Sequence, residues 1–268
     1  DTGRITAAVV NSLVGTNKNL LKLGNRTLEL GADNSATFTG GSIVNSQGTL
    51  RVLHDGALGS ATTAVTIERN ATLEIGKANF VPTAAVTQLA GSIERWNQED
   101  ARGTTYNLPA GVNLQLNTNL QSARTIGLNG GTIEGFLHAD HVAQAALRTV
   151  GSAVTLNLLS DSYVGLGNAI GGQNYDAGRQ PTVGQPFGDT YTGSPLMING
   201  AITGAFNLTK TGLDTVTIAG TANTYRNTIV DMGTLRIGAD NALPTAGVLT
   251  PRLGGIVDLY GSTQSVAG

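Results

Sequence analysis

An internal repeat is the feature of this sequence that most constrains its fold. Residues 19–52 align with residues 207–237 with a short gap, and the tetrapeptide GTLR occurs near the end of both segments, at 48–51 and 233–236. The other matched pairs include Asn19 with Asn207, Lys22 with Lys210, Gly24 with Gly212, and Thr27 with Thr215. Self-similarity of this kind indicates a supersecondary unit that buries its apolar face by stacking on its neighbours. We therefore interpret the repeat as a building unit and not as a site.

A shorter period lies inside each copy of the repeat. The expected strand centres are Leu28, Leu50 and Leu73 in the first copy and Val216, Leu235 and Val257 in the second, at spacings of 19 to 23 residues. The strands alternate polar and apolar residues, as in TLEL and TVTI, so one face of each strand points into a core. Glycine follows several strands directly, at Gly31, Gly76 and Gly238, where it permits the positive φ that a sharp corner needs.

These spacings predict an all-β chain folded as a right-handed parallel β-helix, or solenoid, with loop excursions and at most one short helix. We expect one continuous β-helix over 1–268, with repeat copies at about 19–76 and 207–261 and irregular middle coils at 77–206. At roughly 22 residues per coil, the chain is long enough for about twelve coils. Leu50, Leu73, Val216, Leu235 and Val257 are expected to point inward, and Thr49, Arg51 and Arg236 outward.

The second copy of the repeat resembles a known family. The pattern LTKTG, TVTI, TY and GTLRIG over 208–238 is similar to the autotransporter-associated β-strand repeat of passenger domains exported by Gram-negative bacteria. The resemblance is specific over about 207–244 and weaker over 19–76. It implies an extracellular or cell-surface β-helical segment that acts as an adhesin or a rigid stalk, associated with the outer membrane through a part that lies outside this chain. The family carries no universal catalytic residue.

Composition and charge exclude several classes of protein. The chain has no cysteine, so we expect neither disulfides nor a thiolate metal site. Its net charge is −2 and no Lys/Arg cluster is visible, which argues against a nucleic-acid partner. Apolar residues occur in short runs, so we expect no transmembrane segment. The N-terminus DTGRITAAVV lacks the features of a signal peptide, and we expect that such a peptide was removed or that the chain is a fragment.

Two short motifs have a weak resemblance to ligand sites. His138 and His141, in LHADHV, have a spacing that zinc ligands use, but a third ligand is missing. A short helix or turn capped by Asp140 explains this motif better. The segment GLGNAIGG at 165–172 is glycine-rich like a phosphate-binding loop, yet no helical pattern follows it. We expect a loop excursion over about 163–195 and no metal or cofactor.

The densest group of charges is IERWNQEDARG at 93–103. Acidic residues and arginine beside a tryptophan are equipment that a sugar-cleaving enzyme uses. However, Glu99 and Asp100 are adjacent and on a strand would face opposite ways. We therefore expect a solvated loop with ion pairs and predict no catalytic residue, because no nucleophile and base occur at a recognisable spacing.

Aromatic residues gather where the repeat pattern is interrupted, at 93–107 and 163–195. Six of the twelve aromatic residues lie there: Trp96, Tyr106, Tyr163, Tyr175, Phe187 and Tyr191. Aromatic side chains are enriched at binding hot spots, so these six form the predicted recognition surface. The alternative is that the rings fold back onto the coil as lids. The expected partners are a second copy of the chain or a host or matrix glycan or protein.

Three functions are consistent with these features. The first is a non-enzymatic extracellular surface scaffold or adhesin that presents loops for adhesion or self-association. The second is a self-assembling extracellular filament subunit. The third is a polysaccharide hydrolase or lyase on a β-helix platform, which rests on fold analogy and the 93–103 charge cluster.

Overall fold

The computed structural model describes residues 7–137, 147–165, 168–169, 173–174, 192–252 and 254–267. The chain forms two compact units, Asp1–Gly103 and Thr104–Gly268. The described residues are nearly all β, as predicted, with parallel strands stacked into a β-solenoid of about 10 turns. A 3-10 helix, η1 (Asp55–Leu58), is the helical element that they contain.

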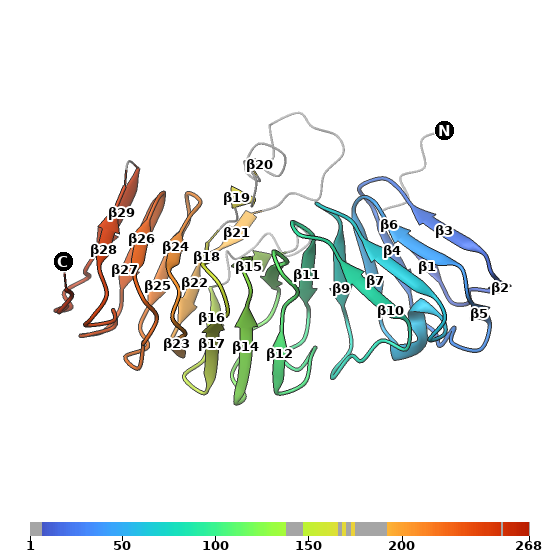
Figure 1. The fold of residues 1–268 in the computed structure, drawn as a ribbon, viewed down its shortest axis with the longest axis horizontal. Coiled ribbons are helices and arrows are strands. Elements are labelled where there is room, and N and C mark those ends of the chain that lie inside the picture. Colours follow the sequence, from blue (N-terminus) through green and yellow to red (C-terminus); the bar gives the residue numbers. More distant parts are fainter. Residues whose placement is uncertain are drawn as a thin grey trace. The chain divides into compact units, whose positions relative to one another are not determined.

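In the first unit each turn of the solenoid contributes strands to two parallel ladders. The strands are β1 (Ala7–Val10), β2 (Gly15–Thr16), β3 (Asn19–Lys22), β4 (Thr27–Leu30), β5 (Phe38–Thr39), β6 (Ser42–Asn45), β7 (Thr49–Val52), β8 (Ala64–Ile67), β9 (Thr72–Ile75), β10 (Ala85–Gln88) and β11 (Ile93–Trp96). One ladder has the order β1-β4-β7-β9-β11 and the other β10-β8-β6-β3, while β2 pairs with β5. Figure 1 shows β4, β7 and β9 side by side.

The second unit contains three parallel ladders. Its strands are β12 (Thr105–Asn107), β13 (Asn113–Leu116), β14 (Arg124–Leu128), β15 (Thr132–Leu137), β16 (Arg148–Val150), β17 (Val154–Leu158), β18 (Ser162–Val164), β19 (Asn168–Ala169), β20 (Gln173–Asn174), β21 (Thr192–Ser194), β22 (Leu196–Ile198), β23 (Ala201–Thr203), β24 (Leu208–Lys210), β25 (Thr215–Ile218), β26 (Thr228–Val230), β27 (Gly233–Ile237), β28 (Leu249–Pro251) and β29 (Gly255–Asp258). The ladders are β13-β15-β18-β24-β26-β28, β12-β14-β17-β23 and β16-β22-β25-β27-β29. Among the described strands, β15 with β21 and β19 with β20 pair antiparallel.

The predicted strand centres are register partners in the structure. Leu28 pairs with Leu50 and Leu50 with Leu73, and in the second unit Val216 pairs with Leu235 and Leu235 with Val257. Leu50, Leu73, Val216 and Leu235 are fully buried, whereas Val257 is half-buried. The core of each unit is therefore a stack of aliphatic side chains inside the coil.

The expectation that Thr49 faces solvent is wrong. Its exposed fraction is 5%, although it lies on the opposite face of β7 from Leu50. Thr49 is held between Thr27 and Thr72 in the ladder, so stacking from both neighbouring turns covers it. Arg51 and Arg236 are half-buried on the outward faces of their strands.

The role predicted for the glycines after the strands is also wrong. Gly31, Gly76 and Gly238 do not adopt positive φ, and Gly76 instead allows a close approach, since a Cβ there would lie 2.4 Å from Leu53 Cδ2. In the first unit each of the short corners that precede β4, β7, β9 and β11 contains a left-handed residue, at Gly24, Gly48, Asn70 and Gly91, and further left-handed residues such as Gly40 and Gly41 lie outside these corners. Gly48 has φ 68° and faces the carbonyl of Gly24 in the previous corner, so no side chain fits there.

The third side of each turn in the first unit is an arc without a continuous ladder, and polar side chains connect successive arcs. Asn34 accepts a bond from the backbone N–H of Leu13 and donates to the carbonyl of Ala57, in the turns before and after it. Asp55 binds Lys77 at 2.7 Å and the backbone N–H of Val81 at 2.8 Å. Backbone bonds also join successive arcs, for example from Asn34 N–H to the carbonyl of Gly56 at 2.9 Å, so the arcs are held by both kinds of contact.

The turns use unequal numbers of residues, which explains why about twelve coils were expected and about 10 are found. Thr132 pairs with Tyr163, and Ser162 pairs with Leu208. Both intervals exceed the length of a regular coil. The second includes the expected excursion, whose returning end is β21, paired antiparallel with β15.

Truncating the stacked leucine Leu73 to alanine is expected to lower the free energy of unfolding by about 2–5 kcal/mol, because the cavity cannot collapse between two fixed neighbouring turns. Leu23→Ala is the matched control, since Leu23 is 64% exposed and its loss is expected to change stability by less than about 0.5 kcal/mol. Urea denaturation followed by circular dichroism measures both. Equal losses for the two variants would contradict the stacked core.

Candidate functional site

The charge cluster at 93–103 is part of the solenoid and not the solvated loop that we expected. Ile93, Glu94, Arg95 and Trp96 form β11 and all four are buried. The cluster continues in the arc after β11, which spans 97–103 and contains the buried residue Arg102. The expectation was wrong because the charges of this strand are neutralised in pairs, on both of its faces.

Glu94 lies inside the coil, in the position that leucine occupies in the earlier turns. It is the register partner of Leu73, and its exposed fraction is 0%. Arg102 donates to both carboxylate oxygens, from Nε to Oε1 at 3.0 Å and from Nη2 to Oε2 at 2.8 Å. Trp96 Nε1 donates to Oε1 at 2.7 Å, and Gln88 Nε2 donates to Oε2 at 2.6 Å. This carboxylate is therefore bound from its own strand, from β10 of the other ladder and from the arc.

The charge of Glu94 is maintained by these partners. Burial by itself raises the pKa of the carboxyl, but the Arg102 guanidinium and the hydrogen bonds from Arg102, Trp96 and Gln88 outweigh it, so the pKa lies below the ordinary value. An ionised carboxylate without solvent access is suited to holding structure. It is poorly placed to exchange a proton with a polymeric substrate, which a general acid or base must reach.

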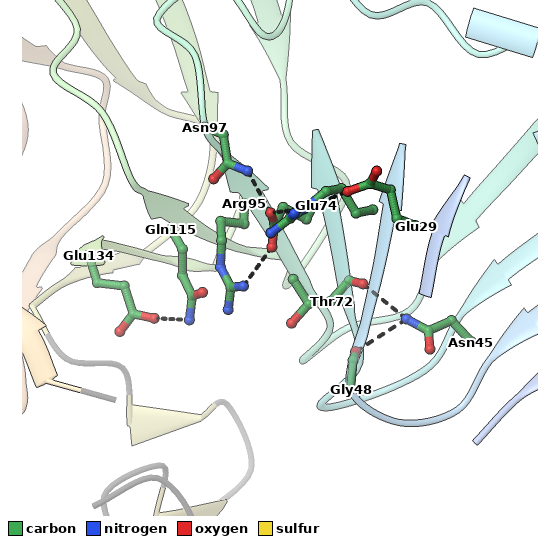
Figure 2. A network of polar contacts seen from close by, with 10 residues as sticks. Glu29, Asn45, Gly48, Thr72, Glu74, Arg95, Asn97, Gln115 and Glu134 are labelled. Atoms are coloured by element: carbon green, nitrogen blue, oxygen red, sulfur yellow. Dashed lines mark hydrogen bonds and ion pairs between the residues drawn. The ribbon is translucent and has the colours of Figure 1, made fainter. Parts of the chain in front are cut away.

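A second row of charges follows the outward face of the ladder β4-β7-β9-β11. Glu29, Arg51, Glu74 and Arg95 are successive register partners with alternating charge. Arg51 Nη1 lies 3.1 Å from Glu29 Oε2, and Arg95 Nη1 lies 2.8 Å from Glu74 Oε2. Figure 2 shows Glu29, Glu74 and Arg95 of this row together with Asn97, which also donates to Glu74. Each acid in the row is thus an ion-pair partner of the arginine beside it.

Glu74 is the most enclosed acid of this row. Burial raises its pKa, and the charges of Arg95 and Arg51 together with the hydrogen bond from Asn97 lower it by more, so the pKa is below the ordinary value. In the second unit Gln115 Nε2 donates to Glu134 Oε1 at 2.6 Å (Figure 2). Glu99 and Asp100, the acid pair of the enzyme hypothesis, are half-buried in the arc after β11.

The predicted recognition residues have different environments. Trp96 is fully buried on the inward face of β11, so it is neither the exposed ring that we predicted nor a lid folded back onto the coil. Tyr106 on β12 and Tyr163 on β18 are half-buried. Tyr175, Phe187 and Tyr191 lie outside the described residues.

The other motifs of the sequence lie largely outside the described residues. His138, Asp140 and His141 lie outside the described residues. Within those residues, no group of three or more His, Cys, Asp or Glu side chains is arranged to hold a metal ion. None of the described helices has the length and hydrophobicity needed to cross a membrane. From the segment 165–172, the structure describes Gly165 and the short strand β19.

Sequence reasoning overlooked the role of the repeated lysine. Lys22 Nζ donates to the carbonyls of Gly24 and Gln47, both at 2.6 Å. Lys210 Nζ donates to the carbonyls of Thr211, Gly212 and Met232, at 2.6, 2.8 and 3.1 Å. In both copies the ammonium group thus binds its own corner and the corner of the next turn. The alignment of Lys22 with Lys210 was the sequence signal for this role. It was overlooked because the alternation of polar and apolar residues predicts apolar side chains on the inward face of a strand, where these lysines lie.

The two lysines differ in how their charge is compensated. Lys210 has an additional contact, with Asp214 Oδ1 at 3.0 Å, and both side chains are buried. Burial lowers the pKa of Lys22. Each ammonium replaces the water that corner carbonyls otherwise need.

Comparison of the chain with known protein families, with curated proteins and with solved structures found no match.

Replacing Lys210 with methionine is expected to destabilise the chain by about 3–5 kcal/mol, since the variant removes a buried ammonium group that contacts Asp214 and three carbonyls. Lys77→Met is the control, because Lys77 forms one partly exposed ion pair with Asp55 and is worth at most about 1 kcal/mol. Chemical denaturation of both variants tests this role. A Lys210→Met variant as stable as the Lys77→Met variant would show that the ammonium group does not hold the corners.

Proposed function

We propose that this chain is a non-enzymatic segment of an extracellular or cell-surface β-solenoid that acts as a scaffold or adhesin of the passenger type. The sequence pattern of 207–244 supports this proposal through its resemblance to autotransporter-associated repeats. The parallel ladders support it as well, since a solenoid can present loops without a separate domain for each.

The observation that carries the proposal is the internal use of the 93–103 charge cluster. Glu94 is enclosed and bound to Arg102, and Arg95 is bound to Glu74. These were the charged groups closest to the tryptophan, and none of them offers an accessible acid to a polysaccharide. The buried part of the cluster therefore supports a structural role, while Glu99 and Asp100, the acid pair of the enzyme alternative, are half-buried in the arc after β11.

The surface for recognition is proposed to lie on the excursion between β18 and β22 and on the neighbouring tyrosines. The excursion carries Tyr175, Phe187 and Tyr191 in its sequence, and Tyr163 lies on the strand before it. Pairing of β21 with β15 ties the returning end to the solenoid. A loop tied at its base to a rigid ladder is a common support for recognition residues.

Screening of the purified chain against polysaccharides is expected to show no turnover, and binding to matrix glycans or proteins is expected to weaken when Tyr175, Phe187 and Tyr191 are replaced by serine. Tyr225→Phe is the control, because Tyr225 is buried and its hydroxyl contacts Thr228 at 2.8 Å. Release of oligosaccharide that Glu99→Gln or Asp100→Asn abolishes would contradict a non-enzymatic function.

A self-assembling filament subunit is the second candidate. The outward faces of two ladders, β10-β8-β6-β3 and β12-β14-β17-β23, favour it. The outward side chains of β3, β6, β8 and β10 are uncharged: Asn19, Leu21, Ser42, Val44, Ala64, Thr66, Ala85 and Thr87. In the second unit the outward residues of β12, β14, β17 and β23 are also uncharged: Thr105, Asn107, Thr125, Gly127, Thr155, Asn157, Ala201 and Thr203. Charges on β surfaces prevent association between copies, and these two faces have none.

Introducing a lysine on such a face is expected to reduce self-association. Thr66→Lys and Thr155→Lys each add a charge that must be desolvated when two faces meet. Thr221→Lys is the control, because Thr221 is exposed in a bend outside the sheets. Sedimentation velocity over a range of concentrations measures the effect. Equal assembly of all three variants, or a monomeric parent chain, would exclude these faces as contacts.

A further inference from the structure

Tyr260, in the turn after β29, is exposed and has a strained backbone. The exposed fraction of this residue is 70%. Tyr260 has φ 47° and Gly261 has φ 80°, and the backbone N–H of Ser262 donates to the carbonyl of Leu259 at 2.7 Å, which is the pattern of a type I′ turn. Asparagine, aspartate and glycine are preferred at the centre of this turn, whereas a bulky side chain with positive φ is unfavourable. The turn itself therefore gives no reason for a tyrosine.

Two residues of the adjacent strands fix the ring of Tyr260. The Cζ atom of Arg236, on β27, lies over the ring at 4.5 Å from its centre. Arg236 Nε donates to Asp258 Oδ2 at 2.9 Å, and the backbone N–H of Tyr260 donates to Asp258 Oδ1 at 3.0 Å. Arg236 and Asp258 are register partners on the outward face of their ladder. The ring is thus held on this outward face, where the guanidinium covers one side of it and leaves the other side to solvent.

The polar groups of this site carry no net charge. Arg236 and Asp258 form an ion pair in which both side chains are partly exposed. The hydrogen bonds from Arg236 and from the N–H of Tyr260 hold the pKa of Asp258 below its ordinary value, so the carboxylate is ionised at neutral pH. The two Nη groups of Arg236 carry further N–H donors, and each carboxylate oxygen has a second lone pair. The site therefore offers hydrogen-bond donors and acceptors side by side.

Ile256 extends the apolar part of this surface. It lies two residues before Asp258 on the same face of β29, and its exposed fraction is 58%. The register partner of Ile256 is Thr234, and Thr217 on β25 is the register partner of Arg236. An aromatic ring and an aliphatic side chain thus lie among charged and hydroxyl groups. This combination suits a ligand that has both an apolar face and hydroxyl groups.

We propose that Tyr260, Arg236 and Asp258 form a binding site for a neutral hexopyranose unit of a glycan. The C–H groups on one face of a sugar ring pack against the open side of the tyrosine ring. The sugar hydroxyls both donate and accept, so two neighbouring hydroxyls pair with an Nη group of Arg236 and an oxygen of Asp258. The tyrosine ring is fixed before a ligand arrives, which lowers the entropy cost of binding.

The charges of the site decide between classes of ligand. A phosphate or uronate group is attracted by Arg236 but repelled by Asp258, which lies at hydrogen-bond distance from the guanidinium. A neutral sugar meets no such repulsion. The site rests on the role in adhesion proposed above but uses none of the residues of the excursion, so the two proposals can fail separately.

Calorimetric titration of the whole chain with neutral oligosaccharides of glucose, galactose and mannose tests the site. In Tyr260→Asn, the Kd of an oligosaccharide that the parent chain binds is expected to rise at least about tenfold, because the stacking surface is lost. The melting temperature of this variant is expected to be unchanged or higher, since asparagine tolerates positive φ. Tyr260→Phe keeps the ring, and its Kd is expected to stay within about twofold of the parent value. Leu213→Asn is the control, because Leu213 is also exposed in this unit; its Kd is expected to equal that of the parent chain.

The site is contradicted by a parent chain that binds none of these oligosaccharides, or by an unchanged Kd in Tyr260→Asn. Stronger binding of a uronate oligosaccharide than of every neutral one would overturn the class of ligand. Binding to a matrix protein freed of its glycans, if it depends on Tyr260, would assign the ring to a protein partner instead. Loss of oligosaccharide binding in the triple serine variant of Tyr175, Phe187 and Tyr191, with full binding in Tyr260→Asn, would place recognition on the excursion and leave the proposed function intact.

Discussion

In-register stacking of parallel strands is the constraint on which the rest of this structure depends. Each strand bonds to the strand one turn earlier and one turn later, so a residue's environment is set by its register partners more than by its neighbours in sequence. Leu50 is buried because Leu28 and Leu73 lie on either side of it. The same rule buries Thr49, whose face of the strand was expected to be solvated. Stacking therefore encloses short polar side chains as well as aliphatic ones.

Stacking also determines where charges are tolerated. An outward row of like charges spaced one strand apart would repel, and the row of Glu29, Arg51, Glu74 and Arg95 alternates in sign instead. Inside the coil a lone carboxylate would be far costlier, and Glu94 is accordingly surrounded by a bidentate arginine and two neutral donors. Replacing such a pair with apolar residues is often neutral for stability, so its value here lies in fixing the position of the arc that provides Arg102.

The sequence was sufficient to predict the ladders but not the corners and arcs. Alternation and spacing identified the register of Leu28, Leu50 and Leu73 because backbone pairing repeats with every turn. The inward positions of Lys22 and Glu94 break that alternation, and their partners come from sequence-distant carbonyls and from an arc with no periodic pattern. The same limitation led us to place Trp96 on the surface, since a strand with two charged residues resembles a loop in sequence. Lys22 and Glu94, where the alternation of polar and apolar residues fails, thus form buried polar contacts. Trp96 takes part in the contact of Glu94, to which it donates a hydrogen bond.

Ladders and arcs have different roles in this fold. Ladder strands are fixed by backbone bonds on both sides, so a change of side chain there alters packing before it alters the path of the chain. The arcs of the first unit combine scattered backbone bonds with side-chain contacts such as Asn34 with Ala57, Asp55 with Lys77, and Arg102 with Glu94. Segments held by few contacts open at lower free energy than the elements that they connect. A solenoid built in this way can vary its arcs and excursions while the ladders keep their register, and this separation is the physical basis of our proposal that recognition lies on the excursion between β18 and β22.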